Sequence, residues 1–307
     1  MDSPIGESVP KTSVAAPSVL TAAPRPRETS GLRAFGRRFM RARLAWVGLL
    51  IIVAFALMAI FAPSLAPYDP NKQSLTQLLQ PPNAQHWLGT DELGRDILSR
   101  ILYGARVSLS VGIISVGIAL VIGVVLGLIS GYFGGWTDTL IGRGTDALLA
   151  FPALVLALAI TSALGPSLTN AMLAIGVVGI PIYVRLTRGQ VLALKEREFV
   201  EGARVAGASS PRIIFRHILP NVTSPIIVQA SLGVAFAVLA EAGLSFLGLG
   251  VQPPTASWGS MINTGKNYLE MDPWVAIVPG IAIFLTVLGF NFLGDGIRDA
   301  LDPHLKL

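Results

Sequence analysis

Six apolar runs without a charged residue alternate with polar segments along this chain of 307 residues. A helix that crosses the hydrocarbon core of a bilayer needs roughly 20 predominantly apolar residues, and the longer runs reach that length. The pattern therefore predicts six membrane-spanning helices, within residues 44–62, 107–129, 147–164, 168–184, 226–239 and 274–293.

The chain before the second run divides into three parts. Residues 1–31 are rich in Pro, Ser, Ala and Thr without an apolar period, which predicts a disordered cytoplasmic tail. Residues 32–43 interleave arginines with apolar side chains, as in a helix lying on the inner membrane surface. A signal peptide is the alternative for residues 44–62, but its apolar region would have roughly 7–15 residues. The longer run favours a first membrane-spanning helix that enters from the cytoplasm.

Composition places the chain among multi-pass membrane proteins. Hydrophobic residues make up 52% of it and charged residues 13%, whereas soluble domains carry about 25% charged residues. The net charge of +5 does not indicate a nucleic-acid partner, because the basic residues flank the apolar runs instead of forming one patch. The absence of cysteine excludes a disulfide framework, a thiol nucleophile and a Cys-ligated metal site.

The distribution of lysine and arginine predicts the orientation of the spans. With the N-terminus inside, 18 of the 23 basic residues fall in the predicted inner segments and four in the outer ones, while Arg106 stands at a boundary. Inner segments of membrane proteins carry an excess of Lys and Arg. Both termini and the polar segment 195–221 are therefore predicted to lie in the cytoplasm.

The polar segment 195–221 has the chemistry of two short helices joined by a turn. Good helix formers over residues 195–205 predict the first helix, and Gly207 permits the reversal that follows. Ser210 before Pro211 predicts an N-cap and a first helical position. A polar segment of this length between apolar runs indicates a role outside the bilayer.

The second helix is expected to reach Leu219, because Pro220 limits its continuation. Small residues leave room for another protein to approach the first helix and the turn, at Gly202, Ala203, Ala206 and Ala208. Charged side chains flank this surface, at Glu201, Arg204, Arg212 and Arg216. The segment thus predicts a docking surface for a protein; the alternative is an ordinary basic cytoplasmic loop that follows the positive-inside rule.

This segment resembles the cytoplasmic coupling loop of binding-protein-dependent ABC importer permeases. The family pattern is Glu-Ala-Ala, three residues, Gly, nine residues and Ile-x-Leu-Pro. The chain matches it at Glu201, Ala203, Gly207, Leu219 and Pro220, and departs from it at Gly202 and His217. The resemblance implies an ATPase-coupling surface made by Glu201, Gly202, Ala203, Arg204, Gly207, Leu219 and Pro220.

Three other stretches resemble the C-type permease subunit of dipeptide, oligopeptide and nickel importers. They are HWLGTDELGRDILSRILYGARVSL at 86–109, LSFLGLGVQPP at 244–254 and NFLGDGIRDALDP at 291–303. The resemblance covers residues 32–307 and implies an all-α polytopic protein with six transmembrane helices and the type I ABC importer permease fold. Residues 32–105 would hold the interfacial helix, the first span and an extracytoplasmic loop. Residues 106–307 would form the core domain, with five spans and the coupling loop.

The same resemblance implies partners that composition cannot supply. They are a sister permease in a heterodimer, two ABC ATPase subunits that carry ATP and Mg, and an extracytoplasmic substrate-binding protein, all at a bacterial inner membrane. No cofactor is expected in this chain. The implied cargo is a di- or oligopeptide, with nickel chelates, glutathione and haem as alternatives.

Two sets of charged residues are further candidates for function. Asp91, Glu92, Arg95 and Asp96 are expected to form a salt-bridged helix start, with metal binding by the three acids and His86 as the less favoured alternative. Glu241 stands in an apolar run, which makes it a candidate for the translocation path. The alternative for Glu241 is a carboxylate that faces water at a cavity mouth. Glycines that follow it predict a break in the helix, at Gly243, Gly248 and Gly250.

Missing motifs bear on the class of protein. No G-x-x-x-x-G-K-[ST] pattern occurs, so the chain is not expected to bind ATP as P-loop proteins do. An intramembrane enzyme would need a polar catalytic pair within the spans, and the apolar runs contain none. A passive channel would not need a long cytoplasmic docking segment. The sequence therefore predicts a permease that is not itself an enzyme.

Overall fold

The structure is a computed structural model that describes residues 36, 39, 40 and 42–301. The predicted tail over residues 1–31, most of the predicted interfacial helix and the last six residues lie outside the described residues.

The described residues form helices and no named strand, which confirms the all-α prediction for this part of the chain. The helices are α2 (Arg43–Leu65), α3 (Ile97–Phe133), α4 (Gly135–Leu149), α5 (Ala153–Leu164), α6 (Leu168–Leu194), α7 (Glu198–Val205), α8 (Ser210–Arg212), a π-helical turn (Ile213–Ile218), α9 (Leu219–Phe246), α10 (Trp258–Gly265), a 3-10 turn (Lys266–Tyr268) and α11 (Trp274–Leu301). Among the described residues, five of these segments are long and apolar enough to cross a membrane, or six if the bent pair α4–α5 counts as one span.

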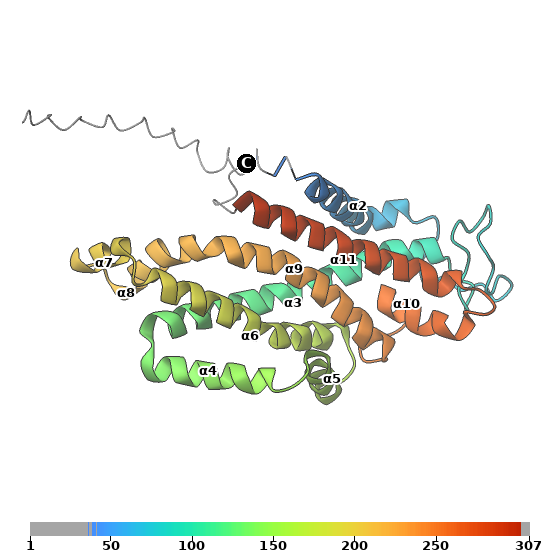
Figure 1. The fold of residues 1–307 in the computed structure, drawn as a ribbon. Helices are drawn as coiled ribbons and strands as arrows, with labels where there is room; N and C mark the ends of the chain where they lie inside the picture. The colour runs from blue at the N-terminus through green and yellow to red at the C-terminus, as the bar shows by residue number, and fades with distance from the viewer. Residues whose placement is uncertain (1–35, 37–38, 41, 302–307) are drawn as a thin grey trace, which may run out of the picture.

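The long helices pack side by side into an elongated bundle (Figure 1). Helices α3, α6 and α9 lie in its middle, α2 and α11 cover one side, and α4 and α5 lie on the other. Helix α2 begins, and α11 finishes, on the side of the bundle that carries α7 and α8 (Figure 1). The 66–96 loop and α10 occupy the opposite end. Gly296 of α11 lies directly against Ala45 of α2, which agrees with this placement.

The central pair α3–α6 owes its close approach to glycine. A methyl group added to Gly123 would lie 2.5 Å from Cβ of Tyr183, and one added to Gly127 would lie 2.7 Å from Cβ of Thr187. Both glycines belong to a G-x-x-x-G pair on α3, a spacing that lets helices in lipid pack backbone to backbone. This contact fixes α6, and with it the start of the 195–221 segment, against the centre of the bundle.

The predicted third span, over residues 147–164, is wrong as a single helix. Helices α4 and α5 meet at a bend of 90°. Pro152 is the N-cap of α5 with an extended ψ of 132°. A proline lacks the N–H that would continue the preceding helix, and it disfavours helical backbone at the residue before it. The break therefore follows from Pro152, which the prediction had placed near the end of a continuous helix.

Two predicted boundaries also differ from the structure. Helix α3 begins at Ile97, so the expected domain boundary between residues 105 and 106 falls inside this helix. Helix α11 begins at Trp274 as predicted but runs to Leu301, past the expected end at residue 293. In both places the helix continues through charged residues, where the loss of hydrophobicity marks the expected edge of the bilayer and not the end of the helix.

Candidate functional site

The 195–221 segment lies at one end of the bundle and has one buried side and one exposed side (Figure 1). Val200 of α7 is completely buried, as are Ile213 and Ile218 of the π-helical turn, in an apolar cluster with Val191 of α6. This cluster joins the segment to the long helices. A displacement of α7 would therefore have to move the buried cluster with it.

The outer side of the segment is exposed and partly apolar. Glu201, Gly202 and Arg204 lie on it, and so does Gly207 in the following turn. Ala203 is half-buried and contributes to the cluster beneath. Among the ion pairs of the described residues, none includes Glu201 or Arg204. Their charges are thus free of intramolecular partners in the part of the chain that the structure covers.

Two apolar side chains on the exposed side were missed by the sequence analysis. Val205 is 85% exposed at the end of α7, and Phe215 is 62% exposed in the π-helical turn. Val205 follows the buried Val200 by five residues, a spacing that turns it well away from the buried face of a helix. That spacing was a usable signal. Protein interfaces have an apolar centre and a polar rim. The exposed side of the segment offers apolar side chains for the first and unpaired charges for the second.

Gly207 makes the predicted reversal, with a φ of +80°. Residues with side chains seldom adopt this region, so the turn depends on glycine. The first helix begins at Glu198, three residues after the predicted start. The N-cap of the next helix is Ser209 and not Ser210, which is already helical.

The prediction that Pro220 limits the second helix is wrong. Pro220 stands in the first turn of α9, and residues 210–246 form one continuous helical segment. The N–H of Leu219 bonds to the carbonyl of Ile214, five residues earlier, so the turn before the proline is widened. A proline is tolerated where the helix does not need its N–H. Leu219 and Pro220 accordingly belong to the long helix that crosses the bundle, and Leu219 packs on the cluster below α7.

At the opposite end, the charged residues before α3 form the predicted salt-bridged helix start. Asp91 accepts from Arg95 Nε at 2.7 Å and lies 3.4 Å from Arg100 Nε, with all three side chains buried. Asp96 caps α3 by accepting from the Ser99 N–H at 2.8 Å. The four groups considered for a metal site are therefore engaged with arginines, a helix end and each other, since His86 Nδ1 lies 2.9 Å from the Asp96 carboxylate.

Glu92 is the member of this cluster whose ionised form the fold disfavours. Burial raises the pKa of the Glu92 carboxyl above its usual 4.5, and the neighbouring Asp91 charge adds to this effect. One carboxylate oxygen bonds to Arg95 Nη2 at 2.8 Å. The other is buried without a hydrogen-bond partner among the described residues.

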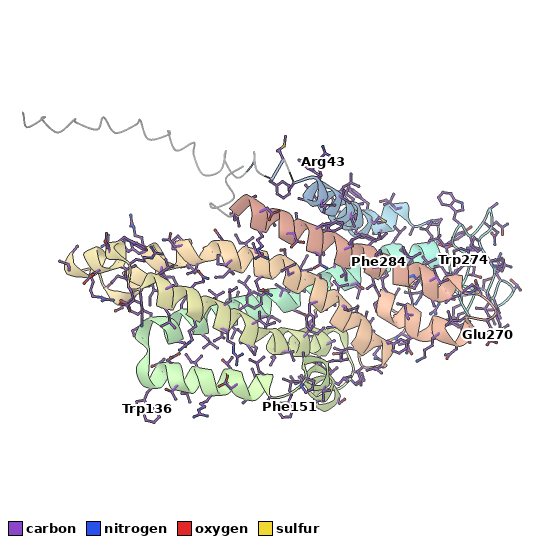
Figure 2. The ribbon with its side chains drawn as sticks, in the orientation of Figure 1. Arg43, Trp136, Phe151, Glu270, Trp274 and Phe284 are labelled. Carbon is purple, nitrogen blue, oxygen red and sulfur yellow. The ribbon has the colours of Figure 1, made fainter. Side chains whose placement is uncertain are left out.

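Replacing Glu92 with glutamine is expected to raise the thermal stability of the protein near neutral pH. The folded state disfavours the ionised carboxyl, and this penalty acts at pH values above the raised pKa and disappears as pH falls to 4.5. Thermal unfolding of the detergent-solubilised protein between neutral pH and pH 4.5 should show the advantage of the variant shrinking as the pH falls. Glu270→Gln is the control, because Glu270 is exposed at the same end of the molecule (Figure 2). A Glu92→Gln variant that is less stable near neutral pH would contradict this account.

Glu241 is completely buried, so the expectation that its carboxyl faces water is wrong. Its carboxylate accepts from Ser245 Oγ at 2.6 Å and from Ser108 Oγ at 3.3 Å. Helix α9 ends five residues later at Phe246, and Gly248 takes a φ of +81°. The predicted break is thus confirmed near Gly248, whereas Gly243 is still helical. The sequence could not indicate the burial, because Ser108 comes from a distant part of the chain.

Comparison with known proteins decides the family. A family model described as the binding-protein-dependent transport system inner membrane component matches residues 123–307. A second model, described as the N-terminal TM domain of oligopeptide transport permease C, matches residues 30–82. The chain belongs to the binding-protein-dependent ABC importer permeases. The permease is thus an inner membrane component of a bacterial ABC transporter, and the ATP hydrolysis of such a transporter is done by separate subunits.

Similar proteins cover nearly the whole permease. The dipeptide transport system permease protein of Alkalihalophilus pseudofirmus is 51% identical, over 88% of this chain and 89% of its own. A probable D,D-dipeptide transport system permease protein of Escherichia coli is 49% identical, over 90% and 96%. The glutathione transport system permease protein of Pectobacterium atrosepticum is 46% identical, over 89% and 91%.

A solved structure bears out the fold. A chain of the inward-facing MetNI methionine ABC transporter superposes with a TM-score of 0.54 at 17% identity, over 67% of the permease and 98% of that chain. At this identity the likeness speaks for the fold alone. It confirms the type I importer permease architecture that the sequence predicts.

Two ion pairs join α4 of the permease to α6. Asp138 pairs with Arg188 of α6 at 2.6 Å, and Asp146 pairs with Arg185 at 2.8 Å. These pairs border a polar cavity of about 340 Å³ between α4 and α6. Trp136 and Phe151 point away from the bundle near the two ends of α4 (Figure 2) and are 89% and 57% exposed. The sequence analysis did not find these pairs, because their members are about 40 to 50 residues apart.

Proposed function

We propose that this permease is the C-type transmembrane subunit of an ATP-driven importer of di- or oligopeptides. The observation that carries the proposal is the similarity to dipeptide permeases over about nine-tenths of both chains. The 195–221 segment adds a physical reason for the ATP-driven class, because it presents an exposed and unpaired surface at one end of the bundle. A sister permease would complete the translocation path.

The exposed side of the 195–221 segment would receive an ATPase subunit. Val205 and Phe215 offer apolar area, and Glu201 and Arg204 offer charges for partners on the other protein. The two ATPase subunits would hold ATP and Mg, and an extracytoplasmic protein would deliver the cargo at the opposite end. The coupling residues would be Glu201, Gly202, Ala203, Arg204 and Gly207 on or near the exposed face, with Leu219 and Pro220 at the start of α9 joining that face to the long helix.

The orientation that this proposal needs has its own expected result. Alkaline phosphatase fused after Leu307 should be inactive, and phosphatase fused after Gln80 should be active, because the enzyme matures only outside the cytoplasm. The excess of basic residues in the inner segments supports this orientation. It also agrees with the structure, in which α2 begins and α11 ends toward the same end of the bundle. Active phosphatase after Leu307 together with inactive phosphatase after Gln80 would reverse the orientation.

The cargo is tested by uptake in a strain that lacks the gene. We expect the deletion strain to lose uptake of labelled dipeptides when other peptide importers have been removed, and a plasmid copy to restore it. Glutathione is the second candidate, because one of the similar proteins is a glutathione permease. Intact dipeptide uptake with lost glutathione, nickel-chelate or haem uptake would contradict the peptide assignment and identify the actual cargo.

A further inference from the structure

The Glu241 carboxylate accepts from hydroxyl groups on two helices. Ser108 belongs to α3 and Ser245 to α9 itself. All three side chains are buried, and among the ion pairs of the described residues none includes Glu241. An apolar side chain of similar volume would fill the same space without burying a polar group. Unlike an apolar side chain, the carboxylate makes directional hydrogen bonds. These bonds fix the helices that carry the hydroxyl groups relative to one another.

Helix α10, whose N-cap is Ser257, packs closely against the same two helices. The indole of Trp258 is completely buried, and its Nε1 donates to the carbonyl of Ile101 on α3 at 3.1 Å. A methyl group added to Gly259 would lie 2.6 Å from Cα of Ala242 on α9. The hydroxyl of Ser245 also accepts from the Val251 N–H at 3.1 Å, which ties the loop between α9 and α10 to the same cluster. Helix α10 is thus held against α3 and α9 at its first turn.

Helix α9 connects this cluster to the other end of the molecule. Residues 210–246 form one continuous helical segment. It starts at the turn that follows Gly207 and carries Glu241 near its far end. At a rise of about 1.5 Å per residue, such a helix spans roughly 50 Å. A shift of α10 relative to α3 therefore acts on the helix whose other end carries the 195–221 segment.

We propose that Glu241 is a positioning residue: its carboxylate clasps α3 to α9 and, through Ser245, to the loop that leads into α10, so that a binding protein docked on the α10 end acts through α9 on the 195–221 segment. This inference rests on the proposed function for its partner, but the clasp is a property of this chain alone. It replaces a role for Glu241 on the surface of the translocation path. It assigns Ser108 and Ser245 to the same clasp.

The first test measures how firmly α10 is held. The chain has no cysteine, so Met261→Cys introduces a single thiol on a buried position of α10. In the assembled transporter we expect slow reaction of this thiol with a membrane-impermeant maleimide. Adding Glu241→Ala should raise the labelling rate about tenfold, as expected when buried hydrogen bonds that hold the helix are lost. An unchanged labelling rate would overturn the clasp.

The second test separates positioning from folding. With the complete transporter in proteoliposomes, ATP hydrolysis is measured with and without the loaded binding protein. Glu241→Ala should reduce the stimulation by the binding protein about tenfold while basal hydrolysis stays the same. Glu241→Gln should keep most of the stimulation, because its carbonyl oxygen can accept from one serine while its amide nitrogen donates to the hydroxyl oxygen of the other. Equal loss of basal and stimulated hydrolysis, or full stimulation in Glu241→Ala, would overturn the proposal.

A matched pair of serines keeps the test decisive if Glu241→Ala fails to accumulate. Ser108 and Ser115 lie two turns apart on α3 and are both buried, but Ser108 donates to Glu241 and Ser115 donates to the Met172 carbonyl of α6. The Ser108→Ala, Ser245→Ala double variant should lose stimulation and Ser115→Ala should not. Equal behaviour of the two would overturn the clasp. If the loaded binding protein fails to stimulate the unmodified transporter, the proposed function fails, and the maleimide labelling still decides the clasp.

Discussion

Glu201→Lys is expected to abolish uptake and to release the ATPase subunit while the variant chain still inserts into the membrane. Glu201 is exposed on α7 and has no ion-pair partner among the described residues. Its proposed partner is a basic residue of the ATPase, so lysine replaces attraction with repulsion. Breaking a buried interfacial charge pair on one side commonly costs about 2–5 kcal/mol, which is roughly thirtyfold or more in affinity.

Gly207→Asp is expected to have the same consequence for a different reason. Its φ of +80° strains a residue with a side chain by about 1–2 kcal/mol. No neighbouring atom lies within 4 Å of a methyl group added there, so the strain comes from the backbone and not from a clash. The turn would change the angle between α7 and α8 and displace the docking surface.

The measurement for both variants is co-purification of the ATPase together with dipeptide uptake. Gly202→Ala is the matched control, because Gly202 has ordinary helical backbone and the family pattern has alanine at this position. Arg204→Ala should have a milder effect, since a charge at the rim of an interface contributes less. Retention of the ATPase and normal uptake in both severe variants would show that this segment is not the coupling element.

Asp91→Ala is expected to prevent accumulation of folded protein. Asp91 lies between the guanidinium groups of Arg95 and Arg100, and it also accepts from the backbone N–H groups of Leu93 and Arg95. Removing one partner of a buried ion pair commonly costs about 3–5 kcal/mol, because the other charge is left buried without compensation. Here one substitution would leave Arg100 without an acidic partner and Arg95 with Glu92 alone.

The effect of Asp91→Ala is checked by the yield and thermal unfolding of the purified chain, and by protease cleavage of the 66–96 loop. Asp69→Ala is the control, because Asp69 is exposed and its side chain accepts only from the nearby Asn71 N–H among the described residues. Its loss should cost at most about 1 kcal/mol, as for other exposed polar groups. A yield and midpoint for Asp91→Ala equal to those of Asp69→Ala would contradict the structural role of the cluster.

The membrane class and most helices follow from the sequence because their cause is local. An apolar run must form a helix in lipid, where no water can satisfy its backbone. This reasoning identified five of the spanning helices and the start of α6 and α11. It also found the reversal at Gly207, since few residues other than glycine adopt that backbone.

The errors occur where a distant residue or a backbone adjustment decides the outcome. Hydrophobicity located the start of α3 at residue 107, but the buried pairing of Arg100 with Asp91 lets the helix begin at Ile97. Pro220 was expected to end a helix, but a widened turn over residues 213–218 accommodates it. A proline can end a helix, or it can stand in the first turn of a helical segment, and only the hydrogen bonds of the preceding turn distinguish the two cases.

The candidate site shows the same division. The residues of the 195–221 segment could be named from their spacing, whereas the exposed Val205 and Phe215 were overlooked in favour of the charges beside them. Glu241 was recognised as unusual and placed on the translocation path or at a water-filled cavity mouth, because Ser108 is 133 residues away and cannot be paired with it from the sequence. Contacts of this range become visible only once α3, α9 and α10 are placed together.

Affinity purification of the tagged chain from its native membrane, with mass spectrometry of the chains that come with it, tests the central claim most directly. The account predicts recovery of one sister permease, ABC ATPase subunits and an extracytoplasmic binding protein that holds a short peptide. The Glu201→Lys variant purified in parallel should bring the sister permease without the ATPases. Purification of the wild-type chain alone, or with partners that include no ATPase, would contradict the assignment of this protein as the permease subunit of an ATP-driven importer.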